Sequence, residues 1–512
     1  MNYYELGGDI MAKEVKKKKK KVTKKILKER AKKKEKIIKI LKVIGSILFA
    51  VFAFLCVSTF LYFLIKCNIV PGKYFYPVLV GILLLFISAF VLDFFSNKKI
   101  LHILSFIVFL LLSIVSIIGS TYLGTTYRFL KHTQVKGEYL SYSVYVLKDS
   151  KITTIHGLKN KNISYIDDSY ISEVQNELQN KIHYTENIHS NVSDTYDSLI
   201  KNNTNAIVLE KGYYSLAKEE IDGFADRIKS IYTFKVKVEN KSSESKNTDV
   251  KVTEPFILYI SGIDQYGDVD SVRGRSDVNQ IIVINPKTNK ILLVNTPRDY
   301  YVQLPGTTGL RDKLTHAGVY GIDKSVETLE SIYDVDINHY VRINFDTLIK
   351  TVDIIGGIDV YSDADFITHT TGQIHINKGW NHFNGTQALA YSRERYAYID
   401  GDHHRGRNQQ QVIEAIINKI TTSDTIIKKY NSILNSLDGS FQTDMDMSFI
   451  TSCVKYQLDK KPTWSIETIQ VTGSASWGYT YSMGYNYYLW VMEPDWNSVA
   501  DAKMRIREAL GK

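Results

Sequence analysis

Three long apolar runs near the amino terminus constrain the fold of this 512-residue chain more than any other feature. Val43–Ile65 and Tyr74–Leu92 contain no charged residue, and the only residue of Ile100–Leu123 that can carry a charge near neutral pH is His102. Each run reaches the roughly 20 residues that an α-helix needs to cross about 30 Å of hydrocarbon. A cleaved signal peptide would have a shorter apolar region. We therefore predict three transmembrane helices within residues 43–123.

The positive charge of the chain is confined to the segment before these helices. The net charge is +10, but residues 1–43 hold 17 Lys and Arg against 5 Asp and Glu, which leaves −2 for the remainder. Lys and Arg stay on the cytoplasmic side of a membrane, so residues 1–42 are predicted to be a basic cytoplasmic tail. After three crossings, the chain beyond about residue 124 lies outside the cell. Its slightly negative charge argues against a transcription factor.

The part beyond the membrane region begins with a small α/β domain, which we place at residues 136–245. Short apolar strands alternate there with polar helical stretches. The strands are predicted at Tyr142–Leu147, Asn162–Ile166 and Ala206–Leu209, and the helices at Ile171–Leu178 and Tyr196–Lys201. Glu239–Thr248 has no large apolar residue and is predicted to be a linker.

The pattern restarts at Pro255, and we predict a second α/β domain over residues 254–512, with a central mixed sheet and a C-terminal extension. Its strands are predicted at Phe256–Ile260, Gln280–Ile284, Lys290–Asn295 and Ile358–Tyr361, and its helices at Lys324–Tyr333, Phe345–Ile355 and Ser498–Leu510. A longer amphipathic helix begins near His403. Val412, Ile413, Ile416, Ile417 and Ile420 recur there at the spacing of a one-sided helix.

Charged residues follow strand ends and precede helix starts throughout this second domain. They are Asp264, Arg275, Asp277, Arg298, Asp299, Lys313, Arg393, Arg395, Asp402 and Arg405, together with Gln409. Arg393 and Arg395 stand two apart, so an extended chain would point both to one side. Arg405 and Gln409 are four apart and share one face of a helix.

This set of residues is typical of a site for a doubly charged phosphate group. Arginine pairs with phosphate oxygens through two parallel hydrogen bonds, and a helix N-terminus adds free N–H groups. Asp264 and Asp277 suit a Mg²⁺ ion that shares substrate phosphates and neutralises charge on a pyrophosphate. Each arginine alone is explained as well by a surface ion pair, but the whole set on one domain is not. No Ser/His/Asp group, Cys–His pair or zinc ligand set stands out.

Several of these segments resemble the LytR–CpsA–Psr family of envelope phosphotransferases. The similar segments, in the family's order over most of residues 254–411, are Ser261-Gly-Ile-Asp264, Gly274-Arg-Ser-Asp277, Thr296-Pro-Arg-Asp299, Lys313-Leu-Thr-His-Ala317, Gly356-Gly-Ile-Asp-Val360, Ala388-Leu-Ala-Tyr-Ser-Arg-Glu-Arg395 and Asp402 through Arg405 to Gln409-Gln410. Three anchor helices and an extra domain are similar to the CpsA-like capsule subgroup. One departure is Asn408, where many members have arginine.

The resemblance implies a membrane-bound transferase. Its members move a glycopolymer, capsular or teichoic-acid-like, from undecaprenyl pyrophosphate to peptidoglycan through a phosphodiester link, with Mg²⁺. By analogy, Asp264 and Asp277 would hold the metal. The pyrophosphate would bind to Arg275, Arg298, Lys313, Arg393, Arg395, Arg405 and Gln409. The expected catalytic residues are Arg275, Arg298, Asp299 and Asp402, with Asp299 or Asp402 as the general base. An apolar groove would hold the lipid tail.

Two other functions are compatible with the same sequence features. The same arginines and metal would serve a hydrolase that cleaves polyprenyl pyrophosphate with water. A non-catalytic membrane regulator of polysaccharide synthesis could bind the lipid-linked polymer outside the cell and signal through the basic tail. Other capsule-synthesis proteins are the candidate partners of that tail.

Overall fold

The computed structural model describes residues 3–96, 98–132, 138–238, 250–263, 273–422, 433, 435 and 439–512. The chain forms two compact units, Met1–Gly124 and Thr125–Lys512. The predicted linker Glu239–Thr248 and the predicted metal ligand Asp264 lie outside the described residues. The boundaries 136–245 and 254–512 stay a prediction, because both stretches lie within the second unit.

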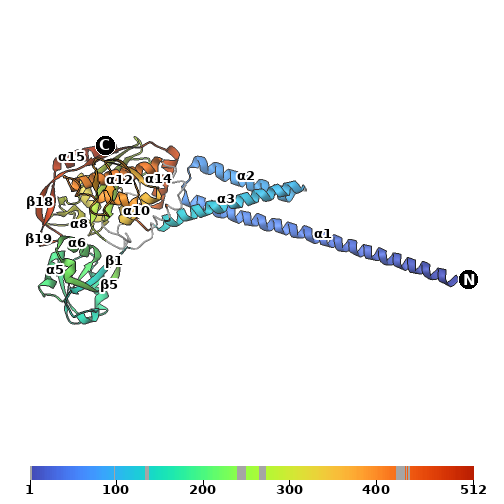
Figure 1. The fold of residues 1–512 in the computed structure, drawn as a ribbon, viewed down its shortest axis with the longest axis horizontal. Coiled ribbons are helices and arrows are strands. Elements are labelled where there is room, and N and C mark those ends of the chain that lie inside the picture. The colour runs from blue at the N-terminus through green and yellow to red at the C-terminus, as the bar shows by residue number, and fades with distance from the viewer. Residues whose placement is uncertain are drawn as a thin grey trace. The chain divides into compact units, whose positions relative to one another are not determined.

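The first unit consists of three long helices, as predicted. They are α1 (Tyr3–Cys67), α2 (Gly72–Phe95) and α3 (Lys99–His132, whose end extends into the second unit) (Figure 1). The segments Leu27–Cys67, Gly72–Phe95 and Lys99–Phe129 are long and apolar enough to cross a membrane. Small side chains such as Ala53 and Ala89 pack against Phe109 between the helices, whereas many large apolar side chains are exposed. This pattern is typical of a membrane anchor, whose outer surface faces lipid.

The second unit begins with a five-stranded sheet in the order β3-β2-β4-β1-β5. The strands are β1 (Glu138–Leu147), β2 (Asn162–Ile166), β3 (Thr185–His189), β4 (Ala206–Glu210) and β5 (Ile228–Val238). The helices are α4 (Ile171–Gln179), α5 (Val192–Ile200), α6 (Lys211–Glu220) and α7 (Phe224–Arg227), with a 3₁₀ turn at Ile155–Leu158. β2 is parallel to β3 and β4, whereas β1 is antiparallel to β4 and β5.

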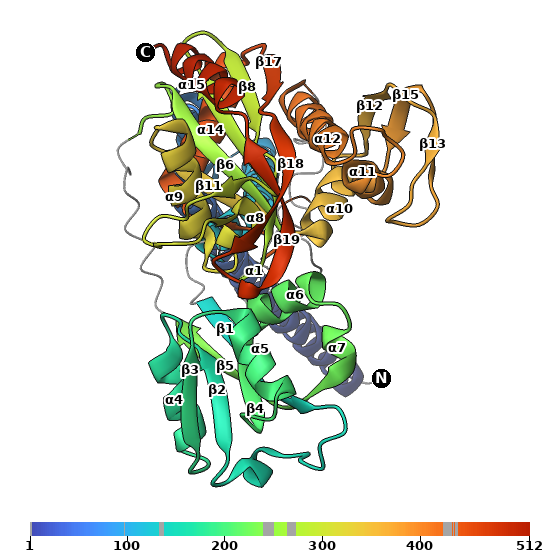
Figure 2. The same ribbon diagram turned by 90° about the vertical axis from the view of Figure 1, so that its left-hand side faces the viewer.

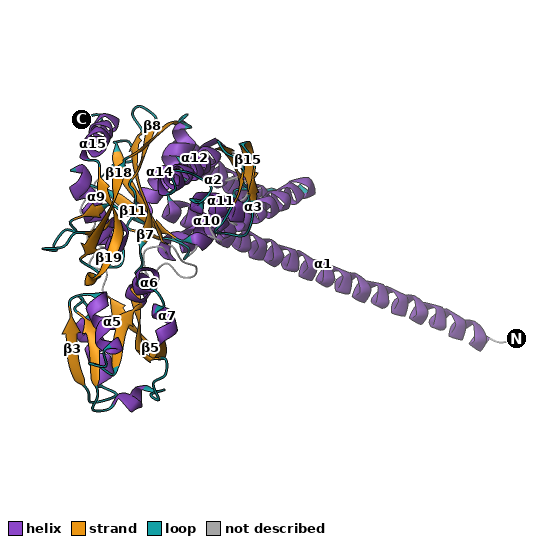
Figure 3. Ribbon diagram, turned by 60° about the vertical axis from the view of Figure 1, so that its left-hand side comes forward, coloured by secondary structure: helices purple, strands orange, loops and turns teal. Residues whose placement is uncertain are grey.

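Alternating side chains of β4 divide between the two faces of this sheet. Ala206 and Val208 pack with Leu178 of α4, whereas Ile207 and Leu209 pack with α5 and α6. Figure 3 shows α5 beside the strands of this sheet. This is the period of two expected of a strand that is buried on both faces. The sheet is therefore covered by helices on both sides.

A second, six-stranded sheet has the order β16-β11-β6-β7-β8-β17 (Figure 2). Its strands are β6 (Phe256–Ile263), β7 (Ser276–Asn285), β8 (Lys290–Asn295), β11 (His339–Ile343), β16 (Gln442–Thr443) and β17 (Ser465–Gln470). β6, β7 and β8 run antiparallel to one another, whereas β11 is parallel to β6 and β17 is parallel to β8. The predicted mixed sheet is confirmed.

Helices cover both faces of the second sheet. On one face, Tyr259 and Val283 pack against α9 (Ile322–Tyr333) and α15 (Trp496–Leu510). On the other, Ile282 and Leu293 pack against α12 (Asp402–Thr422).

A smaller lobe continues from β11 and carries two of the predicted site residues, Arg393 and Arg395. It contains α10 (Phe345–Ile354), β12 (Ile358–Ser362), β13 (Phe366–Ile367), β14 (His375–Ile376), β15 (Gly379–Phe383) and α11 (Gly385–Arg393). Further elements in the described part of the second unit are β9 (Tyr301–Val302), β10 (Asp312–Lys313), α8 (Leu314–Ala317), α14 (Met447–Lys460), β18 (Gly473–Thr480) and β19 (Gly484–Pro494).

Candidate functional site

A polar pocket of about 240 Å³ lies where β6 and β11 end and β7 begins, beside the starts of α10 and α12. Arg298, Arg393, Arg395 and Arg405 line it, together with Gln409. These residues are separated by up to 111 positions in the chain, and the fold brings them to one cavity. The concentration of guanidinium groups makes the pocket a candidate anion site.

Helix α12 delivers two of these side chains, as the sequence predicts. Arg405 and Gln409 lie one turn apart at the start of the helix, and both line the pocket. Gly406 lets this end approach the sheet closely, because a Cβ there would lie 2.2 Å from Nδ2 of Asn295. The positive end of the helix dipole adds partial positive charge on this side of the pocket.

The geometry predicted for Arg393 and Arg395 is wrong, although both side chains line the pocket. Arg393 is the last residue of α11, so the two arginines are not on one extended strand. The helix ends there, and the chain turns extended at Glu394. Arg393 also lies over the ring of Phe345, 4.3 Å from its centroid, which fixes the guanidinium at the start of α10.

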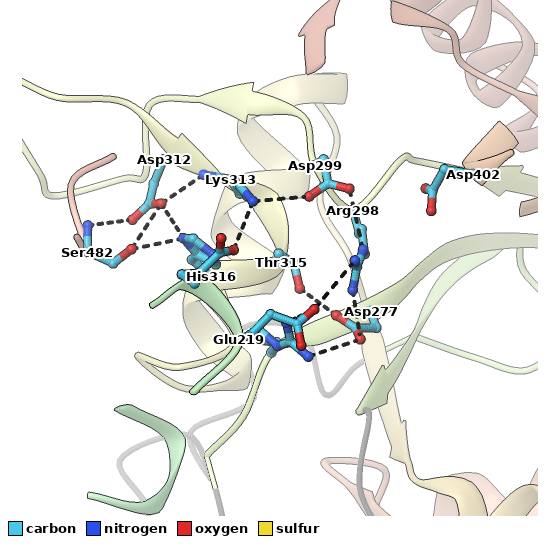
Figure 4. A network of polar contacts seen from close by, with 12 residues as sticks. Glu219, Asp277, Arg298, Asp299, Asp312, Lys313, Thr315, His316, Asp402 and Ser482 are labelled. Carbon is cyan, nitrogen blue, oxygen red and sulfur yellow. Dashed lines mark hydrogen bonds and ion pairs between the residues drawn. The ribbon is translucent and has the colours of Figure 1, made fainter. Parts of the chain in front are cut away.

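Asp277 is the buried counter-charge of the arginines. Its Oδ2 lies 3.1 Å from Arg298 and 3.7 Å from Arg275, and Thr315 donates a 2.8 Å hydrogen bond to Oδ1 (Figure 4). Burial opposes ionisation, but Arg275, Arg298 and Arg405 outweigh it and hold the pKa of Asp277 well below its ordinary value. The carboxylate is therefore charged at neutral pH.

Four other predicted residues do not line the pocket: Arg275 lies behind Asp277, and Asp299, Lys313 and Asp402 lie behind Arg298 or beside Arg405. Asp299 lies 3.4 Å from Nε of Arg298 and 3.6 Å from Nζ of Lys313, and Lys313 pairs with Glu220 at 2.8 Å. Asp402 lies 2.5 Å from Arg405. In this structure Lys313 contacts carboxylates, so direct phosphate binding by Lys313 stays a prediction.

The pocket contains one acidic residue that sequence reasoning missed. Glu219, at the end of α6, lines the pocket and lies 2.9 Å from Arg275 and 3.9 Å from Arg298. Its neighbour Glu220 contacts both Lys313 and His316. Burial opposes ionisation of Glu220, but His316 and Lys313 outweigh it and lower its pKa to about 2.

One signal in the sequence could have identified this pair. Two carboxylates in the last turn of a helix face the negative end of its dipole, which is unfavourable unless cations lie nearby.

An apolar groove of about 880 Å³ adjoins the polar pocket. Its aliphatic lining comes from one face of the second sheet and from α12 and α14, and includes Leu258, Ile260, Ile282, Ile284, Ile413, Ile416, Ile417 and Val454. Ile343 and Leu348 line both the groove and the pocket. An anionic head and an apolar tail of one molecule could therefore occupy the two cavities together.

A sequence model of the LytR_cpsA_psr family matches residues 223–503. The chain belongs to the LytR–CpsA–Psr family. It is 32% identical, over 254 residues, to a protein of Bacillus mycoides (strain KBAB4) named polyisoprenyl-teichoic acid–peptidoglycan teichoic acid transferase TagU, covering 49% of this chain and 79% of that protein. An Enterococcus faecalis (strain ATCC 700802 / V583) protein of the same name is 34% identical over 208 residues, covering 40% and 66%.

Solved structures are similar as well. The crystal structure of B. subtilis TagV is 30% identical, covers 51% of this chain and 98% of its own, and has a TM-score of 0.42. The structure of TagT bound to LIIa-WTA is 25% identical, covers 51% and 92%, and also has a TM-score of 0.42.

The departure of this LytR–CpsA–Psr protein at Asn408 has a local explanation. Asn408 is buried, and its Nδ2 donates a 3.1 Å hydrogen bond to the carbonyl of Tyr391. Arg407 points elsewhere and pairs with Asp400. Within the described part of the chain, the pocket lining does not include Arg407.

The residues near Asp277 are compatible with Mg²⁺. Its carboxylate is ionised and lines the pocket, which is the hard oxygen ligand that this ion prefers. Ile263, the residue before Asp264 in the chain, pairs with Ser276, the residue before Asp277. The described residues contain no group of three or more His, Cys, Asp or Glu that could hold a metal on their own. Beyond Asp277 and the predicted ligand Asp264, a bound ion would take ligands from water and substrate phosphate.

Proposed function

We propose that this chain transfers a glycopolymer from a polyprenyl-pyrophosphate carrier to peptidoglycan, at the outer face of the cell membrane. The continuity of the arginine pocket with the apolar groove, through Ile343 and Leu348, carries this proposal. The names of the relatives support it. The Lys-rich tail supports a cytoplasmic amino terminus. We propose that the polymer is capsular or teichoic-acid-like, because the relatives are named as teichoic acid transferases.

In this reaction the oxygen of an acceptor hydroxyl on peptidoglycan attacks the phosphorus that carries the polymer. The bond from that phosphorus to the bridging oxygen breaks, polyprenyl phosphate leaves, and a phosphodiester joins polymer and wall. Arg298, Arg405 and Gln409 would bind the phosphate oxygens, and Arg275 would stabilise the charge that develops there. Mg²⁺, held by Asp277 and Asp264, would neutralise negative charge on the two phosphates.

The acceptor proton needs a base near the attacking oxygen. Asp402 and Asp299 are the proposed candidates, and Asp402 is the better placed of the two. It stands at the start of α12 and contacts Arg405, which lines the pocket, whereas Asp299 lies between Arg298 and Lys313.

The experiment is a transfer assay with the full chain in detergent or bilayers, lipid-linked polymer, Mg²⁺ and peptidoglycan acceptor. We expect polymer to become linked to peptidoglycan, and Arg298→Ala to reduce the rate at least a hundredfold, as loss of a preorganised charge does. Arg407→Ala, a matched substitution outside the pocket, should retain the wild-type rate. Release of free polymer at the same rate without acceptor would indicate a hydrolase. Unchanged wall attachment by Arg298→Ala in cells would indicate a regulator.

A further inference from the structure

The acidic end of helix α6 enters the arginine site from outside the segment that the family model matches. α6 spans Lys211–Glu220 and follows strand β4 of the first sheet, whereas the family match begins at residue 223. The helix thus belongs to the part of the chain for which the sequence predicted no function. Its last two residues are nevertheless part of the charge cluster around Arg275 and Lys313.

Helix α6 is held firmly against the second half of the unit. At its start, Gly212 lies so close to the backbone of Arg273 that a Cβ there would be 2.7 Å from the carbonyl oxygen. Along its length, Tyr213 and Leu216 are buried in one cluster with Val319 and Met483. The packing of α6 therefore fixes the position of Glu219.

Glu219 differs from the other carboxylate of the pocket in exposure. Its side chain is 46% exposed, compared with 12% for Asp277, so it can turn toward water while Asp277 cannot. It contacts Arg275 at 2.9 Å, a distance typical of a charge-assisted hydrogen bond. A phosphate oxygen needs this same position on the guanidinium, because carboxylate and phosphate use the same N–H groups.

We propose that Glu219 is a displaceable internal competitor for the diphosphate, which lowers the affinity of the site until the ligand replaces it on Arg275. The proposal rests on the function proposed above and adds the first-sheet region to the substrate site. The described pocket lining contains four arginines, Asp277 and Glu219, a net charge of +2. Replacing Glu219 by a neutral residue raises this charge to +3 and removes the carboxylate that the ligand must displace from Arg275.

The test is binding of two probes, farnesyl diphosphate and inorganic pyrophosphate, to the full chain in detergent with Mg²⁺, measured by titration calorimetry. Glu219→Gln should bind both probes about tenfold more tightly than wild type, the scale of one charge-assisted contact. Glu219→Ala, which also removes the hydrogen bond to Arg275, should bind at least as tightly. Asp222→Asn removes the same charge from an exposed position near the helix end and should bind within about twofold of wild type.

Other results would overturn the proposal. Weaker binding by Glu219→Gln would make Glu219 a ligand of the metal or substrate, and equal binding with a slower transfer rate would make it a base. If wild type binds neither probe and Arg298→Ala changes nothing, the proposed function itself has failed. If Arg298→Ala weakens binding of the probes but Glu219→Gln leaves it unchanged, only the proposal for Glu219 is refuted and the proposed function stands.

Discussion

Asp277 determines the charge balance of the pocket, because its carboxylate lies between guanidinium groups that are themselves largely buried. The side chains of Arg275 and Arg298 are 8% and 11% exposed. Without a buried anion, these two groups and Arg405 would repel one another in a region of low dielectric constant. The structural role of Asp277 is therefore inseparable from any role as a metal ligand.

We predict that Asp277→Asn lowers the free energy of unfolding by about 3 kcal/mol, the cost of leaving buried charges without their partner. Asparagine keeps the shape and can still accept the hydrogen bond from Thr315. Chemical denaturation of the full chain at pH 7 measures the effect. Asp222→Asn, at an exposed site, should change the free energy by less than about 0.5 kcal/mol.

The difference in free energy of unfolding between wild type and Asp277→Asn should change with pH in one direction only. The folded protein lowers the pKa of Asp277, so its charge stabilises the fold above its pKa in the unfolded chain, about 4. The difference between wild type and Asp277→Asn should shrink as the pH falls below about 4. A difference that grows in acid would contradict the ion-pair explanation.

The sequence predicts the positions of some site residues well and those of others not at all. Arg405 and Gln409 could be assigned to one face, because helix periodicity fixes a separation of four positions. Arg393 could not, because the end of α11 depends on packing in the smaller lobe. Glu219 was missed because two carboxylates at the negative end of a helix indicate that cations lie nearby but do not say which ones.

Helix α6 is the element that joins the first sheet to the pocket, and its closest approach is at Gly212. A Cβ at this position would meet the backbone oxygen of Arg273 at 2.7 Å and Oε2 of Glu210 at 2.6 Å. Glu210 accepts a hydrogen bond from the N–H of Gly212 and begins the helix. Backbone cannot move aside as a flexible side chain can, so α6 must shift when Gly212 is enlarged.

We predict that Gly212→Ala destabilises the full chain by about 1–3 kcal/mol, the usual cost of overpacking, although alanine is the better helix former. Thermal unfolding in detergent measures the change. Lys218→Ala, at an exposed position of the same helix, should have almost no effect. Stabilisation by Gly212→Ala would mean that helix propensity exceeds the cost of the contact and that α6 is not closely docked.

At the level of elements, the sequence predicts best those strands and helices that have a clear hydrophobic periodicity and turn residues at their ends. The strands Asn162–Ile166 and Lys290–Asn295 have the predicted bounds. β3 and β5 were missed: Thr185–His189 is mostly polar and partly exposed, and Lys residues interrupt Ile228–Val238. Helix α5 starts four residues before its predicted start, because Asn191 caps it through a hydrogen bond from the N–H of Asp194.

The first sheet shares an apolar core with the β18–β19 hairpin, which also packs in the core of the second sheet, so the two sheets are parts of one folding unit. Tyr213 and Leu216 from α6 are buried with Val319, which follows α8, and with Met483 and Leu489 of the β18–β19 hairpin. Separating the sheets would expose this cluster to water, at about 25 cal/mol for each Å² of apolar surface. Glu220 and Lys313 add an ion pair across the same boundary.

This shared core predicts that a cavity made on the far side of the first sheet weakens the second sheet as well. Leu178 of α4 is fully buried in a cluster whose members come only from the first sheet and the segments packed against it. Leu178→Ala should cost about 3 kcal/mol, which corresponds to roughly a hundredfold faster exchange of amides that open only by global unfolding. Hydrogen exchange of the full chain, read by mass spectrometry, should show this acceleration equally in β4 and in β7. Acceleration in β4 alone would mean that the first sheet unfolds independently, and that α6 can leave the arginine pocket without unfolding the second sheet.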